Sequence, residues 1–380
     1  MNHKIFLLVF VSPALFAAAP QYKSPDITIP AASADEAVLK KFSLAKANDY
    51  LEKGALAWAR KRGCVTCHTT GTYMQIRPML SPVLGKPTEE IRELFTGELA
   101  KFQKLKPNDL KTFQQLTPAE MRKVTQPAEI IYTAAGLAEW DRHVTGKLTS
   151  ETQTALELML RIQQKNGTWG SVDLWPPLES SSFQVATVAV MAVATAPGWR
   201  DGLKDAKAKV SIASLQKYLR ETEPPNDYGG VVLLWAAARM SDLLPKERRQ
   251  KLIKMLWSHQ REDGGWAIRT LSSPEKWGRG NRAKKLRAEP EFKNPPSDGH
   301  MTGLAVLVLR EAGVPAKDAR LQKAVQWLLA NQRASGRWWT RSLNTDKFHY
   351  ITYSGTAYPL LALMKCGEIT SKLAPRAKKD

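Results

Sequence analysis

Residues 163–169 read Gln-Gln-Lys-Asn-Gly-Thr-Trp, and their spacing of glutamine, glycine and tryptophan returns twice further along the chain. The two later copies are Gln260-x3-Gly264-x-Trp266 and Gln332-x3-Gly336-x-Trp338. Self-similarity of this kind indicates a structural unit that is repeated and stacked against its neighbours. The repeat therefore decides the fold before any other feature of the sequence.

Each copy lies between two helical patterns of different character. Amphipathic helices are expected just before the copies, at Glu151–Gln164, Lys246–Gln260 and Ala316–Gln332. Helices rich in Ala, Val and Leu are expected after the following loops, at Ser181–Ala196, Gly299–Ala312 and Ser354–Cys366. Two further apolar helices, Ala128–Trp140 and Gly229–Leu244, are expected without a preceding copy.

A helix that is apolar on most faces must be enclosed, whereas an amphipathic helix covers it from outside. The pattern thus predicts an all-α ring of helical hairpins, an α/α barrel. We expect the repeated glutamine to hydrogen-bond free backbone groups at a helix terminus. The glycine allows the turn, and the tryptophan packs beneath it. These residues are predicted to be structural ties.

The repeat resembles the QW motif of the squalene–hopene cyclase and protein prenyltransferase superfamily. The resemblance implies an α/α toroid of about six helical hairpins around an apolar central cavity, here spanning residues 45–370. It also implies that an apolar small molecule is a ligand to consider. The cyclases protonate their substrate with an Asp-x-Asp-Asp-Thr-Ala segment, and the matching stretch, residues 298–303, keeps only Asp298 and Thr302. Terpene cyclase activity is therefore not expected.

The same stretch also resembles the zinc-binding Asp-Gly-Cys of protein farnesyltransferase β subunits, with His300 in place of the cysteine. That family's third ligand is a histidine at the start of the final inner helix, near the position of His349. The resemblance thus implies an alternative zinc site formed by Asp298, His300 and His349. The alternative interpretation of His300 is a structural one, in which a histidine at the start of a helix hydrogen-bonds to Asp298 and binds no metal.

The sharpest local motif is Cys64-Val65-Thr66-Cys67-His68. Two thiols at this spacing can add to the vinyl groups of one haem, and His68 is then placed to ligate the iron from the proximal side. The motif predicts covalent haem c. The competing interpretation is a Cys64–Cys67 disulfide or dithiol redox pair, which would need a thioredoxin-like strand pattern that the sequence lacks. The third thiol, Cys366, is expected in the core.

Aligning Trp58 with Trp327 places the haem motif where the loop of a repeat would run, so that Tyr73 to Leu80 would begin the first inner helix. The haem would then be attached near the N-terminal hairpin and reach toward the central cavity. His300 is the first candidate for the distal iron ligand and His349 the second. The remaining candidates are Met74, Met79 and Met121.

A two-domain arrangement remains open. Residues 45–145 have the length of a small cytochrome c-like domain, which would leave residues 146–370 for the toroid. In that arrangement Met121 or a nearby methionine would be the distal ligand.

The N-terminus has the pattern of a signal peptide. Lys4 precedes an apolar run from Ile5 to Phe16, and Ala17 to Ala19 supply small residues for cleavage. Residues 1–19 are thus predicted to be a signal peptide and 20–44 an N-terminal extension, with export to the periplasm. Residues 371–380 form a basic tail. Beyond residue 20 no segment is long and apolar enough to span a bilayer, which predicts a soluble mature chain.

The chain of 380 residues carries 56 Lys and Arg against 36 Asp and Glu, a net charge of +20. Because an exported protein does not meet nucleic acid, this charge favours an acidic redox partner or an anionic membrane surface. The strongest cluster consists of Arg279, Arg282, Lys284, Lys285 and Arg287. It is interpreted either as a solvated loop or as a docking surface.

Three functions fit these features. The first is electron transfer by an exported c-type haem protein. The second is a haem-dependent oxidoreductase that acts on an isoprenoid-like substrate in the barrel, and the third is a haem-based sensing or binding module. Axial ligation separates them, because two protein ligands leave no place on the iron for substrate or gas.

Overall fold

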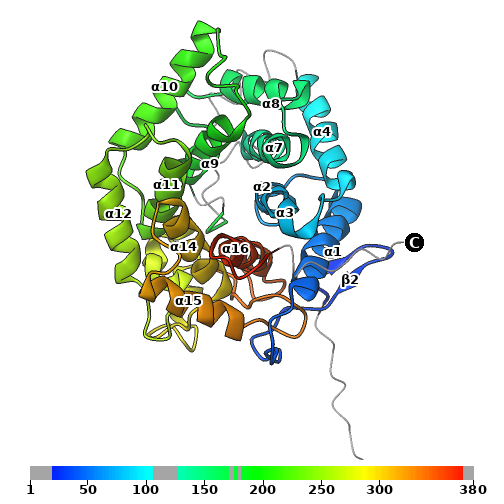
Figure 1. Cartoon of the computed structure of the whole chain (residues 1–380), viewed down its shortest axis with the longest axis vertical. Helices are drawn as coiled ribbons and strands as arrows, with labels where there is room; N and C mark the ends of the chain where they lie inside the picture. Colours follow the sequence, from blue (N-terminus) through cyan, green and yellow to red (C-terminus); the bar gives the residue numbers. More distant parts are fainter. Residues whose placement is uncertain (1–18, 106–126, 171–174, 179–180, 371–380) are drawn as a thin grey trace, which may run out of the picture.

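The computed structural model describes residues 19–105, 127–170, 175–178 and 181–370. Its helices form a ring with an inner and an outer layer (Figure 1). The inner helices are α2 (Thr70–Ile76), α7 (Pro127–Trp140), α9 (Ser182–Thr195), α11 (Asp227–Arg239), α14 (Gly299–Glu311) and α16 (Ile351–Lys365). The outer helices are α1 (Leu44–Arg62), α4 (Glu89–Gln103), α8 (Ser150–Arg161), α10 (Ala206–Glu221), α12 (Lys246–Ser258) and α15 (Ala319–Ala330).

Each inner helix packs against the next, and α16 packs against α2, so the inner layer is closed. Shorter elements lie between the layers or at their ends. They are the helices α3 (Ser81–Leu84) and α13 (Ala283–Arg287), the single turns η1 (Pro78–Leu80), η3 (Ile268–Leu271), η4 (Pro274–Lys276) and η5 (Gly278–Gly280), and the π-helical turn η2 (Asp141–Thr145). The structure is thus an α/α toroid, as the repeat predicts.

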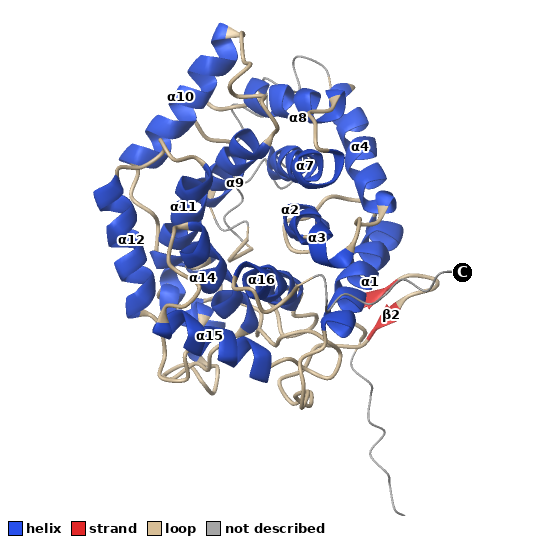
Figure 2. Cartoon of the chain, in the orientation of Figure 1, coloured by secondary structure: helices blue, strands red, loops and turns tan. Residues whose placement is uncertain are grey.

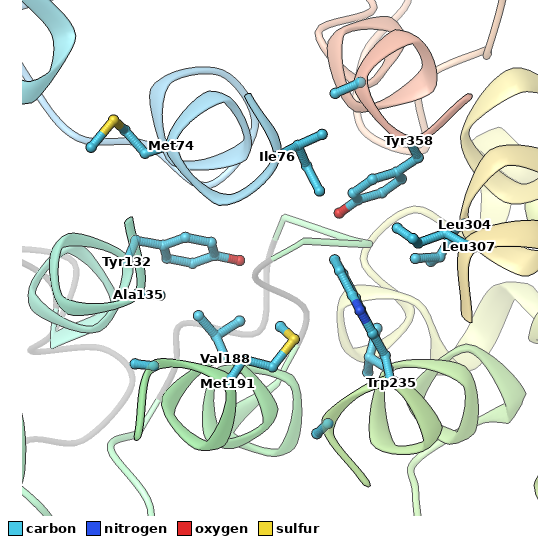
Figure 3. Close-up of a cluster of buried hydrophobic side chains, with 14 of the residues drawn as sticks. Met74, Ile76, Tyr132, Ala135, Val188, Met191, Trp235, Leu304, Leu307 and Tyr358 are labelled. Atoms are coloured by element: carbon cyan, nitrogen blue, oxygen red, sulfur yellow. The ribbon is translucent and has the colours of Figure 1, made fainter. Parts of the chain in front are cut away.

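Burial separates the two layers as the sequence pattern requires. Nearly every residue of α9 and α14 is buried, whereas Leu256 is the buried residue of α12. Side chains from the inner helices meet around the barrel axis (Figure 3). Ile76, Tyr132, Met191, Trp235 and Tyr358 come from five different inner helices and converge there. Burial of these apolar surfaces is the main favourable term that holds the ring together.

The third copy of the repeat joins the two ends of the ring. The Gln332 side-chain amide donates to the Gly336 carbonyl at 2.8 Å and to the Ser43 carbonyl at 3.0 Å. Its Oε1 accepts from the Ser43 backbone N–H at 2.7 Å. Ser43 is the N-cap residue of α1, so this glutamine ties the end of α15 to the start of the first outer helix.

The first two copies make the same bonds between consecutive outer helices. The Gln163 amide reaches the carbonyls of Gly167 and Ser211, and the Gln260 amide reaches those of Gly264 and Arg320. Each motif tryptophan is buried and donates its indole N–H to a carbonyl ten residues earlier, at Met159, Leu256 and Leu328. The predicted role of the repeat as a structural tie is confirmed.

A largely buried ionic cluster lies at one end of the barrel, at the C-terminal ends of inner helices. Arg239 of α11 donates to Glu311 of α14 at 2.5 Å and to Glu139 of α7 at 3.2 Å. A further guanidinium N–H lies 3.0 Å from the Met79 sulfur. Because an unpaired buried charge is very costly, the two carboxylates together hold Arg239 in place at this end of the barrel.

The N-terminal extension contains an antiparallel pair of short strands, β1 (Tyr22–Lys23) and β2 (Thr28–Ile29), shown in red in Figure 2. This hairpin packs on α1. Gln21 anchors it, because its amide donates to the carbonyls of Phe348 and His349 and to the Thr352 hydroxyl. The all-α expectation missed this hairpin, since strands of two residues carry no alternating pattern.

Several helix boundaries differ from the sequence prediction. α15 begins at Ala319 instead of Ala316, because the Asp318 side chain caps its first turn. α16 begins at Ile351, three residues before the predicted Ser354, and it contains Pro359. α11 ends at Arg239, well short of the predicted Leu244. No helix within the described ranges has the length and apolar character to cross a membrane. The segments 1–18, 106–126 and 371–380 lie outside the described residues, and Met121 with them.

Glycine at position 336 can be tested against a glycine of similar conformation. Gly336 has φ 93°, and a Cβ there would lie 2.3 Å from the backbone carbonyl carbon of Lys46 in α1. Gly313 has φ 95° with nothing within 4 Å of such a Cβ. We expect Gly313→Ala to lower the free energy of unfolding by about 1–2 kcal/mol through backbone strain, and Gly336→Ala by about 1–3 kcal/mol more through steric overlap. Denaturant unfolding measures both, and equal losses would contradict this account of ring closure.

Candidate functional site

The Cys-x-x-Cys-His motif lies on the loop that joins outer helix α1 to inner helix α2. Gly63 ends α1 in the left-handed conformation, with φ 60°. Threonines of α2 then hold the loop backbone. The Thr70 hydroxyl accepts from the Thr66 N–H at 3.0 Å, and the Thr72 hydroxyl donates to the Cys67 carbonyl at 2.8 Å. The motif therefore stands where a repeat loop would otherwise lead into an inner helix.

The loop forms one wall of a cavity of about 590 Å³, a volume within the usual range for small-molecule and cofactor sites. The cavity lies at the N-terminal ends of α2, α7 and α16, opposite the end that carries Arg239. It is lined by Val65, Thr66, Cys67, His68, Ala128, Glu129, Tyr132, Trp175, Pro176, Pro177, Leu178, Arg282, Ser342, Asn344, Thr345, Tyr350 and Ile351.

His68 is held from three sides. Its ring stacks on Tyr350 with centroids 4.8 Å apart and planes 7° apart, and it meets the edge of Trp58 at 4.7 Å. Its Nδ1 is 2.7 Å from the Thr69 hydroxyl. Burial lowers the pKa of His68 to about 4, so the imidazole is neutral at pH 7. A neutral imidazole with one nitrogen hydrogen-bonded is the form that binds metal.

Neither Cys64 nor Cys67 is in a disulfide. Cys67 lines the cavity, and a Cys67 thiolate is close enough to Tyr228 and Tyr358 to raise their pKa values further, beyond the larger effect of burial. Burial raises the pKa of the Cys64 thiol. A raised pKa keeps Cys64 protonated, which is the less reactive form of a thiol, at neutral pH.

His300 lies at the start of α14 and is fully buried. Its Nε2 is 3.1 Å from the Tyr228 hydroxyl and its Nδ1 is 2.8 Å from the Ser354 hydroxyl, so both ring nitrogens are engaged. Burial lowers the pKa of His300 to about 3. It does not line the cavity. In this arrangement His300 is a core histidine whose two ring nitrogens are both hydrogen-bonded. Its side-chain partners are Tyr228 and Ser354, whereas the sequence interpretation expected Asp298.

His349 does not line the cavity either. Its Nδ1 accepts from the Ser342 N–H at 3.1 Å, and its ring lies against Trp339. Its backbone has φ 45°, which turns the next residue, Tyr350, onto the cavity wall. Burial, as the largest effect, lowers the pKa of His349 to about 4.

Asp298 caps α14. Its carboxylate accepts from the backbone N–H groups of Met301 and Ile268 and from the Thr340 hydroxyl. Burial raises its pKa to about 6. Within the described ranges no three His, Cys, Asp or Glu side chains gather into a metal-binding group, so Asp298, His300 and His349 are not brought together as the zinc resemblance implied.

Two of the three methionine candidates have other neighbours. Met74 is buried, and its Cβ lies against Gly136 of α7. Met79 contacts Arg239 at the opposite end of the barrel. Met121 is not among the described residues.

Several cavity residues were missed by sequence reasoning. Arg282 belongs to the predicted basic cluster, but its Nε is buried without a hydrogen-bond partner at the cavity wall. The side-chain oxygen of Asn344 is also buried at the cavity wall without a hydrogen-bond partner. Tyr350 could have been found from its place beside His349 at the opening of the last inner helix. In the rest of the basic cluster, Lys285 pairs with Glu289 and Asp346, and Arg287 pairs with Glu275.

Glu129 is the acidic residue on the cavity wall, in the first turn of α7. Burial raises its pKa to about 7, Glu98 raises it further, and Lys101 opposes the shift. Glu129 can therefore gain or lose a proton near neutral pH, at a position beside the Cys-x-x-Cys-His loop.

A pH series on the haem-free chain tests this environment. The folded-state pKa of Glu129 lies above the ordinary value of 4.5, so the folded chain loses stability as pH rises from about 4.5 to 7. Glu129→Gln lacks this loss. We expect its advantage over wild type in the free energy of unfolding to grow by on the order of 2–3 kcal/mol between pH 5 and pH 8. A difference that is the same at both pH values would contradict the assignment.

Comparisons with known proteins agree with the toroid fold. Residues 225–368 match the family model described as the squalene-hopene cyclase C-terminal domain. No curated protein matches the chain at the sequence level. A wild-type glycosidase superposes with a TM-score of 0.53 at 9% identity, over 87% of this chain and 98% of that one. The apo type II terpene cyclase MstE from Scytonema gives a TM-score of 0.44 at 13% identity, over 85% and 99%. The chain is thus an α/α toroid whose C-terminal part is similar to the C-terminal domain of squalene-hopene cyclases.

Proposed function

We propose that this chain is an exported haem c protein that transfers electrons. Cys64 and Cys67 would hold the haem covalently and His68 would ligate its iron, with residues 45–370 forming one toroid that carries the cofactor. The observation that carries the proposal is the position of the Cys-x-x-Cys-His loop on the wall of the cavity, with a neutral imidazole already oriented there.

The cavity wall suits the cofactor chemically. Val65, Ala128, Leu178 and Ile351 supply apolar surface for a macrocycle and exclude water from it. The unpartnered Nε of Arg282 offers a charged hydrogen-bond donor to a propionate. An apolar ligand without carboxylates would leave that buried donor unsatisfied, which favours haem over a plain hydrocarbon chain.

Haem supplies one-electron chemistry when bound, and the residues of this chain determine how it is held. The stacked ring of Tyr350 and the edge of Trp58 fix the imidazole plane of His68. Trp175 lines the cavity and is 44% exposed, so the cavity reaches the molecular surface there. Access from the surface is what exchange of electrons with a separate protein requires. The net charge of +20 favours an acidic partner or an anionic membrane surface.

A specific observation supports a second function, ligand binding or oxidation at an open iron position. Of the described residues that line the cavity, His68 is the one histidine, and none is a methionine. An iron with a single protein ligand has a place for a small gas or a substrate. Asp298, in contrast, accepts three hydrogen bonds as a helix cap and does not support the proton-donor role that terpene cyclisation needs.

The third cysteine provides a matched control for haem attachment. We expect the full chain, exported in a host that attaches haem c, to give a c-type pyridine haemochrome spectrum with one haem per chain. Cys64→Ser or Cys67→Ser should reduce covalent haem strongly, because each removes one thioether. Cys366→Ser should leave it unchanged, since Cys366 lies at the end of α16, away from the cavity. A wild-type chain without covalent haem would overturn the proposal.

Carbon monoxide separates the two functions. If electron transfer is the function, a second strong ligand comes from outside the described cavity wall, and the spectrum of the reduced protein ignores CO. A Soret band that shifts on CO addition would reveal an open iron position. It would replace electron transfer by gas binding or substrate oxidation as the leading function.

A further inference from the structure

A chain of hydrogen bonds connects His68 to the N-terminal hairpin. The His68 Nδ1 is 2.7 Å from the Thr69 hydroxyl oxygen, and the same oxygen is 3.0 Å from the Tyr22 hydroxyl. All three residues lie in the interior or at the cavity wall, and Thr69 is fully buried. Buried hydrogen bonds of this kind are strong and hold their groups in one arrangement.

Tyr22 is itself fixed in place. It lies in β1 and is 3% exposed, with its ring against Trp58 and Tyr350, the two rings that also contact His68. The adjacent Gln21 is buried, and its Oε1 accepts from the Tyr50 hydroxyl and from Arg337. The hairpin is therefore anchored to α1 and to the start of α16, which both lie where the two ends of the ring meet.

We propose that Tyr22 and Thr69 are positioning residues that hold His68 in the Nδ1–H tautomer, so that Nε2 is the nitrogen available to a metal. Thr69 accepts the Nδ1–H bond, and the hydroxyl of Tyr22 fixes the rotamer of Thr69 that makes this contact. The N-terminal extension thus becomes part of the site, although it is distant from the motif in sequence.

The physical basis is the effect of a hydrogen-bond acceptor on an imidazole that ligates a metal. An imidazole bound through one nitrogen is oriented, and made more basic, by the acceptor that its other N–H meets. Loss of that acceptor weakens donation from the imidazole to the iron. Because the oxidised iron gains more from such donation than the reduced iron, the midpoint potential should rise.

The experiment has two readouts, of which the first needs no haem. Nitrogen chemical shifts of the His68 ring, measured by NMR on the haem-free chain at pH 7, report the tautomer. We expect Nδ1–H in wild type and in Thr69→Ser, and a mixture with Nε2–H in Thr69→Val and in Tyr22→Phe. Wild type in the Nε2–H form would overturn the inference, since Thr69 would then be the donor to His68.

The second readout is the midpoint potential of the haem-loaded chain, and this part rests on the proposed function. Thr69→Val should raise the potential, Tyr22→Phe should raise it by less, and Thr69→Ser should restore the wild-type value. Tyr353→Phe is the matched control, because it removes a buried hydroxyl beside Tyr22 that donates to the Leu51 carbonyl and not to Thr69. Its potential should equal that of wild type.

The two failures are distinguishable. A haem-free wild-type chain overturns the proposed function, while the tautomer measurement still decides the role of Thr69 and Tyr22. A haem-loaded chain whose potential is the same in wild type, Thr69→Val and Tyr22→Phe overturns the positioning role. Equal shifts in Tyr22→Phe and Tyr353→Phe would also overturn it, because they would show a general loss of packing in the aromatic cluster.

Discussion

Closure of the ring is the constraint on which the rest of the structure depends. Inner helices such as α9 and α14 are buried along nearly their whole length, so each needs a neighbour on both sides and an outer helix behind it. An open arc would leave α2 and α16 with exposed apolar flanks. The contact between α2 and α16 buries both of these flanks. In the outer layer, two hydrogen bonds between Gln332 and Ser43 fix the same junction. The first and last helices of the ring therefore depend on each other for burial of their apolar surface.

The Cys-x-x-Cys-His motif lies at the junction between the first outer helix and the first inner helix. In the three repeats the loop from an outer helix into the barrel carries Gln, Gly and Trp, which serve as ties. Between α1 and α2 the corresponding loop carries Cys64, Cys67 and His68, and the ties are supplied by Thr70 and Thr72 of α2 instead. The loop leads into inner helix α2, and its residues Val65 to His68 line the cavity.

Sequence reasoning could predict what depends on local pattern. The repeat gave the ring and its two layers, since the period and polarity of each helix follow from residues close in sequence. The Cys-x-x-Cys-His loop was visible for the same reason. The environments of His300 and His349 could not be predicted in this way, because a position near a helix start does not reveal the partners of an imidazole. Packing between distant helices brings Tyr228 and Ser354 to the ring nitrogens of His300. Tyr22, some 47 residues from Thr69, carried no signal at all.

The two ends of the barrel differ in a way that locates the site. At the C-terminal ends of the inner helices, Arg239 pairs with Glu139 and Glu311. At the N-terminal ends the described cavity wall holds buried polar atoms without hydrogen-bond partners, on Arg282 and Asn344, together with the Cys-x-x-Cys-His loop. Unsatisfied buried polar atoms are costly in a finished core, and a polar ligand removes that cost. The unpartnered donor of Arg282 and the unpartnered acceptor of Asn344 line the same cavity, so a polar ligand bound there would satisfy both.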